Sequence, residues 1–407
     1  MERYPLKEDI WWVGAIDWNV RDFHGYETTR GTTYNSYLIT DEKKTLVDGV
    51  RNGFGPETLR RIGNCCDPKT IEYLIVNHVE LDHSGSLPWL IEKLSPVTVV
   101  TSKRGRESLE QHFANEGFAG WDIQVVASGD ELSLGKYTLS FLEVPMVHWP
   151  DSMFTYVKEA KTLLPNDGFG QHLASSKRFA DENDMNVVFE EAARYYANIL
   201  MPFGTQIKKT LAKVQELGLE IDVIGPSHGV LWRRPEDIER IIQAYADWTE
   251  FEAEPKVALI FDTMWKSTEK MTRAIEDGIA QEGVRCEVHQ LGRTTMADVA
   301  LAVLESQAFL VGTPTLNNGM LPSVGAFMTY IKGLRPKNRL VGAYGSFGWG
   351  GGGVKQVNQV LEDLKLDQVD PLELKFIPTE DDLSACVEWG RSVARRLKQA
   401  AEAESKA

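Results

Sequence analysis

The densest group of possible metal ligands follows an apolar stretch, IEYLIVN, at residues 71–77. It offers four potential ligands within six residues, in the run His78-Val-Glu80-Leu-Asp82-His83. In extended backbone the side chains of alternate residues point to one side, so a loop at a strand end could surround ions. Imidazole nitrogen and carboxylate oxygen suit iron or manganese better than a thiolate site would. A polar helix cap is the structural alternative, because a helical stretch follows, but this density of ligand types favours a metal site.

Three further candidate ligands follow later apolar runs: His148 in VPMVHWPDS, Asp167 in LLPNDGFG and His228 in IGPSHGV. Each of the two histidines, taken alone, is more often a structural residue with a satisfied hydrogen bond. An aspartate in a turn rich in Pro, Asn and Gly is, taken alone, more often a turn former. All three share one context, because each lies just after an apolar run, where strand ends collect ligands. This shared context makes them candidates for the same metal site.

Three loops in the C-terminal part combine hydroxyls, amides, glycines and aromatic rings, at residues 263–268, 312–318 and 345–351. Hydroxyl and backbone N–H groups at a helix N-terminus fit a phosphate monoester. Glycines allow close approach of the backbone, and Trp349 offers a stacking face. One Gly-rich turn after a strand is usually only a turn, but three in register with the strands of one domain predict a cofactor site. The candidate cofactor-binding residues are Thr263, Met264, Trp265, Lys266, Ser267, Thr268, Pro314, Thr315, Leu316, Asn317, Asn318, Ser346, Phe347, Gly348, Trp349 and Gly350.

Two different patterns of elements position these groups. In the first part, short β-branched and aromatic runs predict strands, among them TYNSYLI at 33–39, that alternate with helix-like stretches. An amphipathic helix is expected over residues 231–252. A charged linker at 250–255 precedes the second part, where continuous apolar strands, among them those at 308–314 and 340–348, alternate with helices. That alternation predicts a parallel sheet covered on both faces. A chain of 407 residues is long for one core, so we expect two domains, at residues 1–252 and 253–407.

Composition excludes several partners. Lys+Arg 44 against Asp+Glu 59 gives a net charge of -15, which repels nucleic acid and anionic membranes. No run of 18 or more apolar residues and no signal-peptide pattern occur, so the expected location is the cytoplasm. The four cysteines form no C-x-x-C, which argues against a rubredoxin-type iron site or an iron–sulfur cluster. No G-x-G-x-x-G follows a strand, so direct use of a nicotinamide cofactor is unsupported.

The order H-x-E-x-D-H, then His, Asp and His, resembles the metallo-β-lactamase-like domain of flavodiiron proteins. The resemblance covers essentially the whole chain, because a flavodoxin-like FMN domain follows in that family as well. The loop Thr263-Met-Trp-Lys-Ser-Thr268 is similar to the family's S/T-M-W/Y-x-S/N-T-E-K-M, although it lacks the glycine common in small flavodoxins. The implied fold is an αββα sandwich followed by a doubly wound parallel sheet.

The resemblance also implies a ligand set. One iron would take His78, Glu80 and His148, the other would take Asp82, His83 and His228, and Asp167 would bridge them. The zinc hydrolases of the same superfold have His at the position of Glu80, so a harder ion than zinc is expected here. Asp48 matches a position that supports the loop and does not bind metal.

His24 and Tyr195 resemble residues that flank the family's diiron pocket, where they could orient a bound oxygen or donate protons. A packed polar residue with a satisfied hydrogen bond is the structural alternative for each of them. Of the remaining histidines, His112 and His289 are expected at the surface, and His172 is left open because it closely follows Asp167.

By this resemblance the chain is a reductase. Two ferrous ions and reduced FMN supply four electrons, enough to reduce dioxygen to water or to couple two nitric oxide molecules to nitrous oxide and water. In the family the electron donor is usually rubredoxin, or reduced deazaflavin in some archaeal members. A head-to-tail homodimer is also carried over from the family.

Two alternatives stay open from the residues: a zinc hydrolase with an accessory flavodoxin module, and a flavin electron carrier with a purely structural lactamase-like domain. Glu80 argues against the first, and the intact set of seven ligands argues against the second. The choice between dioxygen and nitric oxide is not encoded in any pattern of this sequence.

Overall fold

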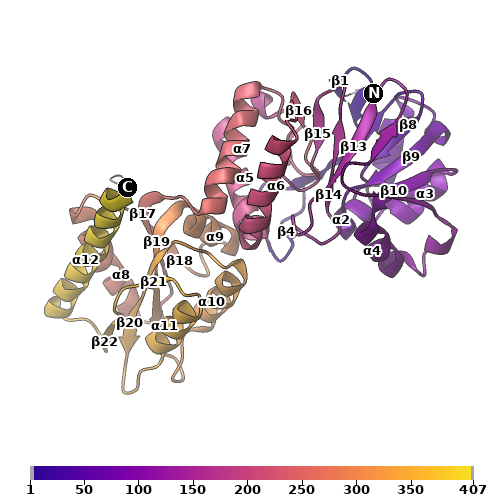
Figure 1. Cartoon of the computed structure of the whole chain (residues 1–407). Coiled ribbons are helices and arrows are strands. Elements are labelled where there is room, and N and C mark those ends of the chain that lie inside the picture. Colours follow the sequence, from indigo (N-terminus) through magenta and orange to yellow (C-terminus); the bar gives the residue numbers. More distant parts are fainter. Residues whose placement is uncertain (1–3, 405–407) are drawn as a thin grey trace. The chain divides into compact units, whose positions relative to one another are not determined.

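The computed structural model describes residues 4–404, with side chains up to residue 400, and consists of two compact units (Figure 1). The first unit contains the chain up to residue 23, residues 28–195 and residues 203–246. The second unit contains residues 24–27, residues 196–202 and the chain from residue 247 onward. A single cut of the chain therefore does not separate the two units.

The first unit contains two large sheets. The larger one has the strand order β1-β2-β7-β8-β9-β10-β11, and the other has the order β12-β13-β14-β15-β16. The strands of the larger sheet are β1 (Tyr4–Lys7), β2 (Ile10–Trp12), β7 (Tyr37–Ile39), β8 (Lys44–Val47), β9 (Ile71–Val76), β10 (Thr98–Ser102) and β11 (Asp122–Val126). Those of the other sheet are β12 (Glu131–Ser133), β13 (Thr138–Glu143), β14 (Met153–Val157), β15 (Thr162–Leu164) and β16 (Val223–Ile224).

The two sheets pack face to face. One core cluster combines buried residues of both, among them Trp12 and Ile75 of the larger sheet with Phe141 and Val157 of the other. The opposite face of the larger sheet packs against helices. Leu74 and Val99 of this sheet share a second core cluster with Leu87 and Ile91 of helix α3 (Leu87–Leu94). This arrangement of helices and stacked sheets is the predicted metallo-β-lactamase-like sandwich, and the prediction is confirmed.

The remaining elements of the first 250 residues are short strands and helices. The strands are β3 (Ala15–Asp17), β4 (Asp22–Phe23), β5 (Tyr26–Glu27) and β6 (Thr32–Tyr34). The α-helices are α1 (Gly55–Gly63), α2 (Leu81–Ser84), α3 (Leu87–Leu94), α4 (Lys103–Phe113), α5 (Met185–Tyr195), α6 (Gly204–Glu216) and α7 (Pro235–Glu250). The shorter helical turns are η1 (Pro68–Thr70), η2 (Phe118–Gly120), η3 (Ala180–Glu182), the π-helical η4 (Tyr196–Leu200) and η5 (Met201–Phe203).

The second unit is built on a parallel sheet with the strand order β18-β17-β19-β20-β21, and β22 also pairs with β20. Its strands are β17 (Glu254–Phe261), β18 (Arg285–Gln290), β19 (Ser306–Pro314), β20 (Leu340–Phe347), β21 (Asp367–Gln368) and β22 (Leu372–Lys375). This order, in which the second strand lies outside the first, is that of flavodoxin-like folds. The predicted doubly wound parallel sheet is confirmed.

Helices alternate with these strands along the chain, as α8 (Ser267–Gln281), α9 (Met296–Glu305), α10 (Pro322–Leu334), α11 (Gly353–Asp363) and α12 (Glu380–Glu404). One face of the sheet packs on α8 and α12, because Ile275 and Val393 share a core cluster with Leu259 and Leu310. Among the described residues, no helix is long and apolar enough to cross a membrane.

One expected strand is divided in the structure. The run at 33–39 forms the end of β6 and the whole of β7, which lie in different sheets. Between them, the buried Asn35 side chain accepts a hydrogen bond from Trp12 Nε1 at 2.7 Å and donates one to the Pro226 carbonyl at 2.7 Å. These contacts at residue 35 come from segments far away in the sequence, so the apolar pattern of the run contains no sign of the division.

Candidate functional site

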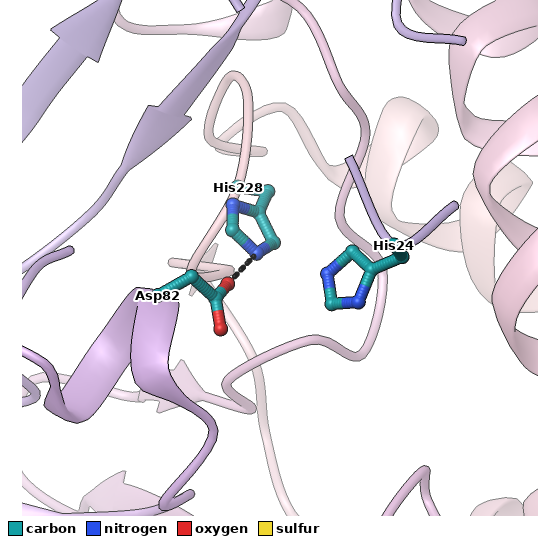
Figure 2. Close-up of side chains that lie close together, drawn as sticks. All are labelled: His24, Asp82 and His228. Atoms are coloured by element: carbon teal, nitrogen blue, oxygen red, sulfur yellow. Dashed lines mark ion pairs between the residues drawn. The ribbon is translucent and has the colours of Figure 1, made fainter. Parts of the chain in front are cut away.

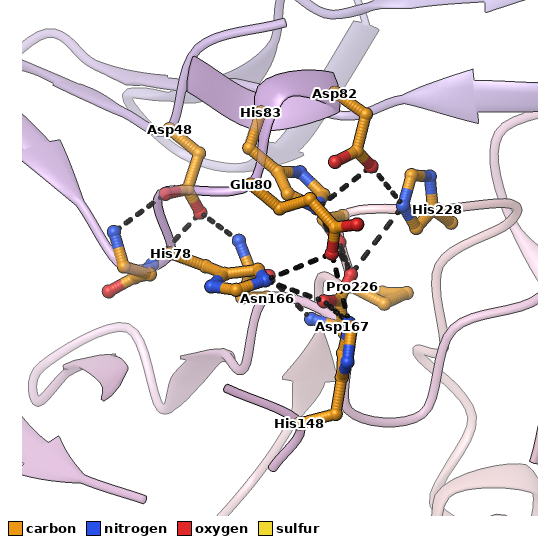
Figure 3. A network of polar contacts seen from close by, with 12 residues as sticks. Asp48, His78, Glu80, Asp82, His83, His148, Asn166, Asp167, Pro226 and His228 are labelled. Carbon is orange, nitrogen blue, oxygen red and sulfur yellow. Dashed lines mark hydrogen bonds and ion pairs between the residues drawn. The ribbon is translucent and has the colours of Figure 1, made fainter. Parts of the chain in front are cut away.

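The candidate metal ligands all follow strands of the sandwich. His78 lies two residues beyond the end of β9, and the one-turn helix α2 carries Asp82 and His83. His148 lies between β13 and β14, Asp167 follows β15, and His228 follows β16. Strand ends of both large sheets thus bring these seven side chains, Glu80 included, into one buried network (Figure 3).

One half of this network contains His78, Glu80 and His148 and is called the first half below. Oε2 of Glu80 lies 3.4 Å from His78 Nε2 and 3.2 Å from His148 Nε2. The same two nitrogens lie 3.6 Å and 3.3 Å from Oδ2 of Asp167. Two imidazoles and two carboxylates therefore converge on one point.

The other half contains Asp82, His83 and His228 and is called the second half. Oδ2 of Asp82 lies 3.0 Å from His83 Nε2 and 3.0 Å from His228 Nε2, and Figure 2 shows the pair with His228. These nitrogens lie 3.2 Å and 3.5 Å from Oδ1 of Asp167. Asp167 thus directs one carboxylate oxygen to each half, which is the geometry of a bridging ligand.

The donor atoms of this network suit two metal cations. Within the described residues, both Asp82 oxygens, Oδ2 of Asp167 and Nε2 of His83 and His228 are buried and make no hydrogen bond of sound geometry. An unsatisfied buried polar atom costs about 1–3 kcal/mol, and a cation at each half would remove that cost by accepting these lone pairs. The donors are nitrogen and oxygen atoms only, which is a set for iron or manganese.

The opposite charges of this network shift the pKa values of its members. Burial lowers the pKa of His78, but hydrogen bonds with Asp151 and Glu80 outweigh burial and raise this pKa to about 10. Burial likewise opposes the charged form of Asp167, but the neighbouring His83 and His148 hold the pKa of its carboxyl well below the usual range. Metal binding must therefore release protons from the imidazoles.

Three contacts behind the ligands were not anticipated from the sequence. His78 Nδ1 lies 2.9 Å from Oδ2 of Asp151, and His228 Nδ1 lies 2.7 Å from the Thr33 carbonyl. Ser227 Oγ donates a hydrogen bond of 2.8 Å to Oδ1 of Asp167. The only signal in the sequence is proximity, since Asp151 and Ser227 lie close to His148 and His228 along the chain.

Asp48 supports the ligand-bearing loop, as expected. It has a positive φ of 59° and follows directly after β8. Its carboxylate accepts hydrogen bonds from the backbone N–H of Asn77 at 2.8 Å, from Asn77 Nδ2 at 3.0 Å and from Asn166 Nδ2 at 3.2 Å. Asp48 therefore connects the neighbours of His78 and Asp167.

Of the two residues predicted to act beside the metals, His24 lies in the segment 24–27 of the second unit and has a positive φ of 54°. The buried Tyr195 ring lies 6.1 Å from the His228 ring, centroid to centroid. Their roles in proton delivery stay predictions.

The other histidines take three different positions. His172 is buried, with its ring 5.0 Å from the rings of both Tyr195 and His228 and its Nδ1 2.8 Å from Thr32 Oγ1. His112 is exposed, as expected. The expectation of a surface position for His289 was wrong, because its side chain is only 16% exposed, and burial lowers its pKa.

The second unit contains a cavity of about 560 Å³ at the carboxyl ends of β17, β19 and β20. Of the predicted FMN-binding residues, thirteen line it: Thr263, Met264, Trp265, Ser267, Pro314, Thr315, Asn317, Asn318, Ser346, Phe347, Gly348, Trp349 and Gly350. Lys266, Thr268 and Leu316 are not among the lining residues, but the buried Thr268 directly follows Ser267, which lines the cavity. It adds Phe376 and Ile377, which follow β22, because that strand runs parallel to β20 and ends at the same sheet edge.

This cavity suits a flavin phosphate and ring. The hydroxyls of Thr263 and Thr268, near the N-terminus of α8, are buried and have no hydrogen-bond partner among the described residues. Such hydroxyls and helix N–H groups are typical phosphate donors. The side chains of Trp265 and Trp349 are 88% and 96% exposed, so both indole faces are accessible to a planar ring.

Comparison with known proteins agrees with both sites. Residues 32–229 match the family model described as ODP family beta lactamase, and residues 259–390 match the Flavodoxin model. The nitric oxide reductase of Moorella thermoacetica is 44% identical over 96% of this chain and 98% of its own length. The rubredoxin-oxygen oxidoreductase of Megalodesulfovibrio gigas is 40% identical over 95% of this chain and 96% of its own length.

A solved structure is also similar to this chain over nearly its whole length. The flavodiiron protein from Giardia intestinalis is 37% identical, with a TM-score of 0.95 over 99% of this chain and 98% of that one. The names of these relatives support an oxidoreductase and give no support to the zinc-hydrolase alternative. The chain therefore belongs to the flavodiiron proteins, oxidoreductases that use FMN and a non-haem diiron centre to reduce dioxygen or nitric oxide.

Proposed function

We propose that the seven converging side chains bind two iron ions. The first half, His78, Glu80 and His148, holds one ion, and the second half, Asp82, His83 and His228, holds the other. The observation that carries this assignment is the division of the Asp167 carboxylate, with Oδ2 near the two histidines of the first half and Oδ1 near those of the second. A carboxylate between two ions holds them close enough to act on one small substrate.

The FMN assignment follows from the cavity of the second unit. The Thr263 and Thr268 hydroxyls, which lack other partners among the described residues, bind the phosphate together with the N-terminus of α8. The loops at 314–318 and 346–350 line the ring, and Trp349 offers its exposed face for stacking. We place the boundary between the diiron part and the FMN part of the chain at residues 252 and 253.

When bound, two ferrous ions and reduced FMN supply the four electrons that reduce dioxygen to water, or couple two nitric oxide molecules to nitrous oxide and water. The residues of the chain hold and orient the reactants. The buried Tyr195, next to the His228 side of the centre, and His24 supply protons to the reduced oxygen atoms. Glu80 and Asp82 add negative charge that stabilises ferric iron.

The electron donor is taken from the name of a relative, and the assembly from the family resemblance of the sequence. One relative is named a rubredoxin-oxygen oxidoreductase, so we propose rubredoxin or a similar small protein as the donor. We also propose a head-to-tail homodimer and a cytoplasmic location. The net charge of -15 speaks against nucleic acid as a partner.

Anaerobic turnover of the iron- and FMN-loaded protein tests this function. We expect about two iron ions and one FMN per chain, and oxidation of reduced FMN on addition of dioxygen or nitric oxide. A protein that binds zinc in preference to iron, or whose reduced FMN reacts with neither gas, would contradict the proposal. A rate ratio above about tenfold between the gases, roughly 1.4 kcal/mol in barrier, decides the dominant activity.

A further inference from the structure

The groups behind the ligands differ between the two halves of the metal centre. In the first half, His78 Nδ1 lies 2.9 Å from Oδ2 of Asp151. Asp151 is itself buried, and the same oxygen accepts the backbone N–H of Val79 at 2.7 Å, which fixes the carboxylate in place. A carboxylate that accepts the N–H of a ligating imidazole makes the ring a stronger electron donor to the metal.

The second half has weaker partners at the equivalent positions. His228 Nδ1 lies 2.7 Å from the Thr33 carbonyl, an uncharged acceptor. His83 Nδ1 is buried and has no hydrogen-bond partner among the residues described. The imidazoles of the second half are therefore expected to donate less electron density than His78 does.

The two oxygens of the Asp167 carboxylate also differ as ligand atoms, and this difference again favours ferric iron in the first half. Oδ1 of Asp167, which faces the second half, accepts the 2.8 Å hydrogen bond from Ser227 Oγ. Oδ2, which faces the first half, has no hydrogen-bond donor of sound geometry in the described part of the chain. A hydrogen bond withdraws electron density from the oxygen that accepts it, so Oδ2 is the stronger ligand atom.

The charge of Asp48 would have the opposite effect on the two iron positions. Asp48 is close enough to His83 for the two to affect each other electrostatically, and an anion there would favour ferric iron in the second half. Its two oxygens, however, accept three N–H hydrogen bonds from Asn77 and Asn166. These bonds offset its charge, so the contacts of Asp151 and Ser227 decide the balance.

We propose that Asp151 and Ser227 are positioning residues that make the two iron positions unequal. When the diferrous centre loses one electron, the ferric ion is the one held by His78, Glu80 and His148. This inference rests on the proposed binding of two iron ions by the seven ligands. It assigns the valence of each position, which the ligand set alone does not define, because both halves contain two imidazoles and one carboxylate in addition to Asp167.

A stepwise redox titration of the FMN- and iron-loaded protein tests the assignment. Ferricyanide takes one electron at a time from the diferrous centre and becomes ferrocyanide. Electron paramagnetic resonance and Mössbauer spectroscopy of ⁵⁷Fe-loaded protein report the mixed-valent state. The variants are Asp151→Asn and Ser227→Ala, and the matched control is Asp181→Asn, which removes a carboxylate that pairs with Arg233 in the same unit.

The two variants are expected to act on different midpoint potentials. Asp151→Asn raises the potential of the first oxidation, because the first half loses its charged support. Ser227→Ala lowers the potential of the second oxidation, because Oδ1 of Asp167 becomes a stronger donor. Each change lowers the comproportionation constant of the mixed-valent state by roughly tenfold, and Asp181→Asn leaves it unchanged.

General damage to the site would not produce this pattern of opposite shifts. The inference is overturned if Asp151→Asn moves only the second potential, if Ser227→Ala moves only the first, or if both iron ions oxidise in one two-electron step. If Asp151→Asn loses its iron, Ser227→Ala alone decides by the same criterion. A wild-type chain that binds no iron at these ligands would instead contradict the proposed function.

Discussion

At the scale of single residues, Asp167 contacts both halves of the metal centre. Its two oxygens approach four histidine nitrogens at distances from 3.2 to 3.6 Å. The carboxylate is buried and is positioned by Ser227 and by its own loop. Other ligands serve one half each, so a change at Asp167 is expected to affect both ions.

Replacing Asp167 by Asn keeps the size of the side chain and removes its charge. We expect iron binding to weaken by at least about tenfold, since even outer partners of metal ligands contribute that much. Iron per chain after anaerobic dialysis is the measurement, with Asp181→Asn as the control of equal chemistry. Full iron retention in Asp167→Asn would show that this residue is not a ligand.

Asp48 is expected to contribute to stability, because its carboxylate accepts hydrogen bonds from Asn77 and Asn166. In Asp48→Asn the new amide would place N–H groups opposite the donors of Asn77 and Asn166. We expect the free energy of unfolding to fall by about 2 kcal/mol, the cost of unsatisfied buried donors. Urea denaturation of the metal-free variant measures this loss, and an effect no larger than that of the part-exposed Asp181→Asn would argue against it.

At the scale of elements, both sites depend on where strands end. The metal ligands follow β9, β13, β15 and β16, and the FMN cavity lies beyond β17, β19, β20 and β22. In the second unit, the carboxyl edge of the parallel sheet collects loops and helix N-termini, which is why a ligand site forms there. Helix α8 adds its N-terminal N–H groups to the hydroxyls of Thr263 and Thr268.

Thr268 at the start of α8 provides a test of the phosphate site. Thr268→Val keeps the shape of the side chain and removes the hydroxyl that lacks a partner among the described residues. A hydrogen bond to a charged phosphate contributes about 1.5–3 kcal/mol, so FMN affinity should fall by about tenfold or more. Quenching of flavin fluorescence measures the affinity.

The control for Thr268 is Thr329→Val on α10, whose hydroxyl bonds only its own helix at Gly325. This variant should bind FMN as the unchanged protein does. Equal affinity in Thr268→Val and Thr329→Val would show that the Thr268 hydroxyl does not contact the phosphate.

At the scale of the whole molecule, metal binding and stability are linked through protons. In the metal-free protein Asp151 and Glu80 raise the pKa of His78 to about 10 against the effect of burial. In the unfolded chain a histidine has a pKa of about 6.5, so the stabilisation of the folded state by the protonated His78 ring is fully present below that pH. It is lost as the pH rises toward 10, and over the same range iron displaces this proton more easily, because iron binding releases it into an increasingly alkaline solution.

The stabilisation of the protein by iron should therefore increase with pH. We expect the difference in Tm between iron-loaded and metal-free protein to widen from pH 6.5 to pH 8.5. Anaerobic scanning calorimetry at a fixed concentration of ferrous iron measures both curves. A difference that stays constant or shrinks across this range would contradict the linkage.

Much of the architecture was predictable because it depends on local patterns. Apolar runs and their spacing indicated the strands around residues 71–77, 308–314 and 340–348, and each is present within a few residues. The ligand types were also visible, since His78, Glu80, Asp82 and His83 lie within one short run. The strand at 33–39 was predicted whole and is divided, because its two parts join different sheets.

The sequence by itself determined the donor set, the loops that carry it and the alternation of strands and helices, because these depend on residues close together in the chain. Only the tertiary structure decided how the donors divide around Asp167 and which groups stand behind them. His78 and Asp151 are 73 residues apart, and His228 and Thr33 are 195 apart. Contacts over such distances depend on the packing of two sheets, which no local pattern contains.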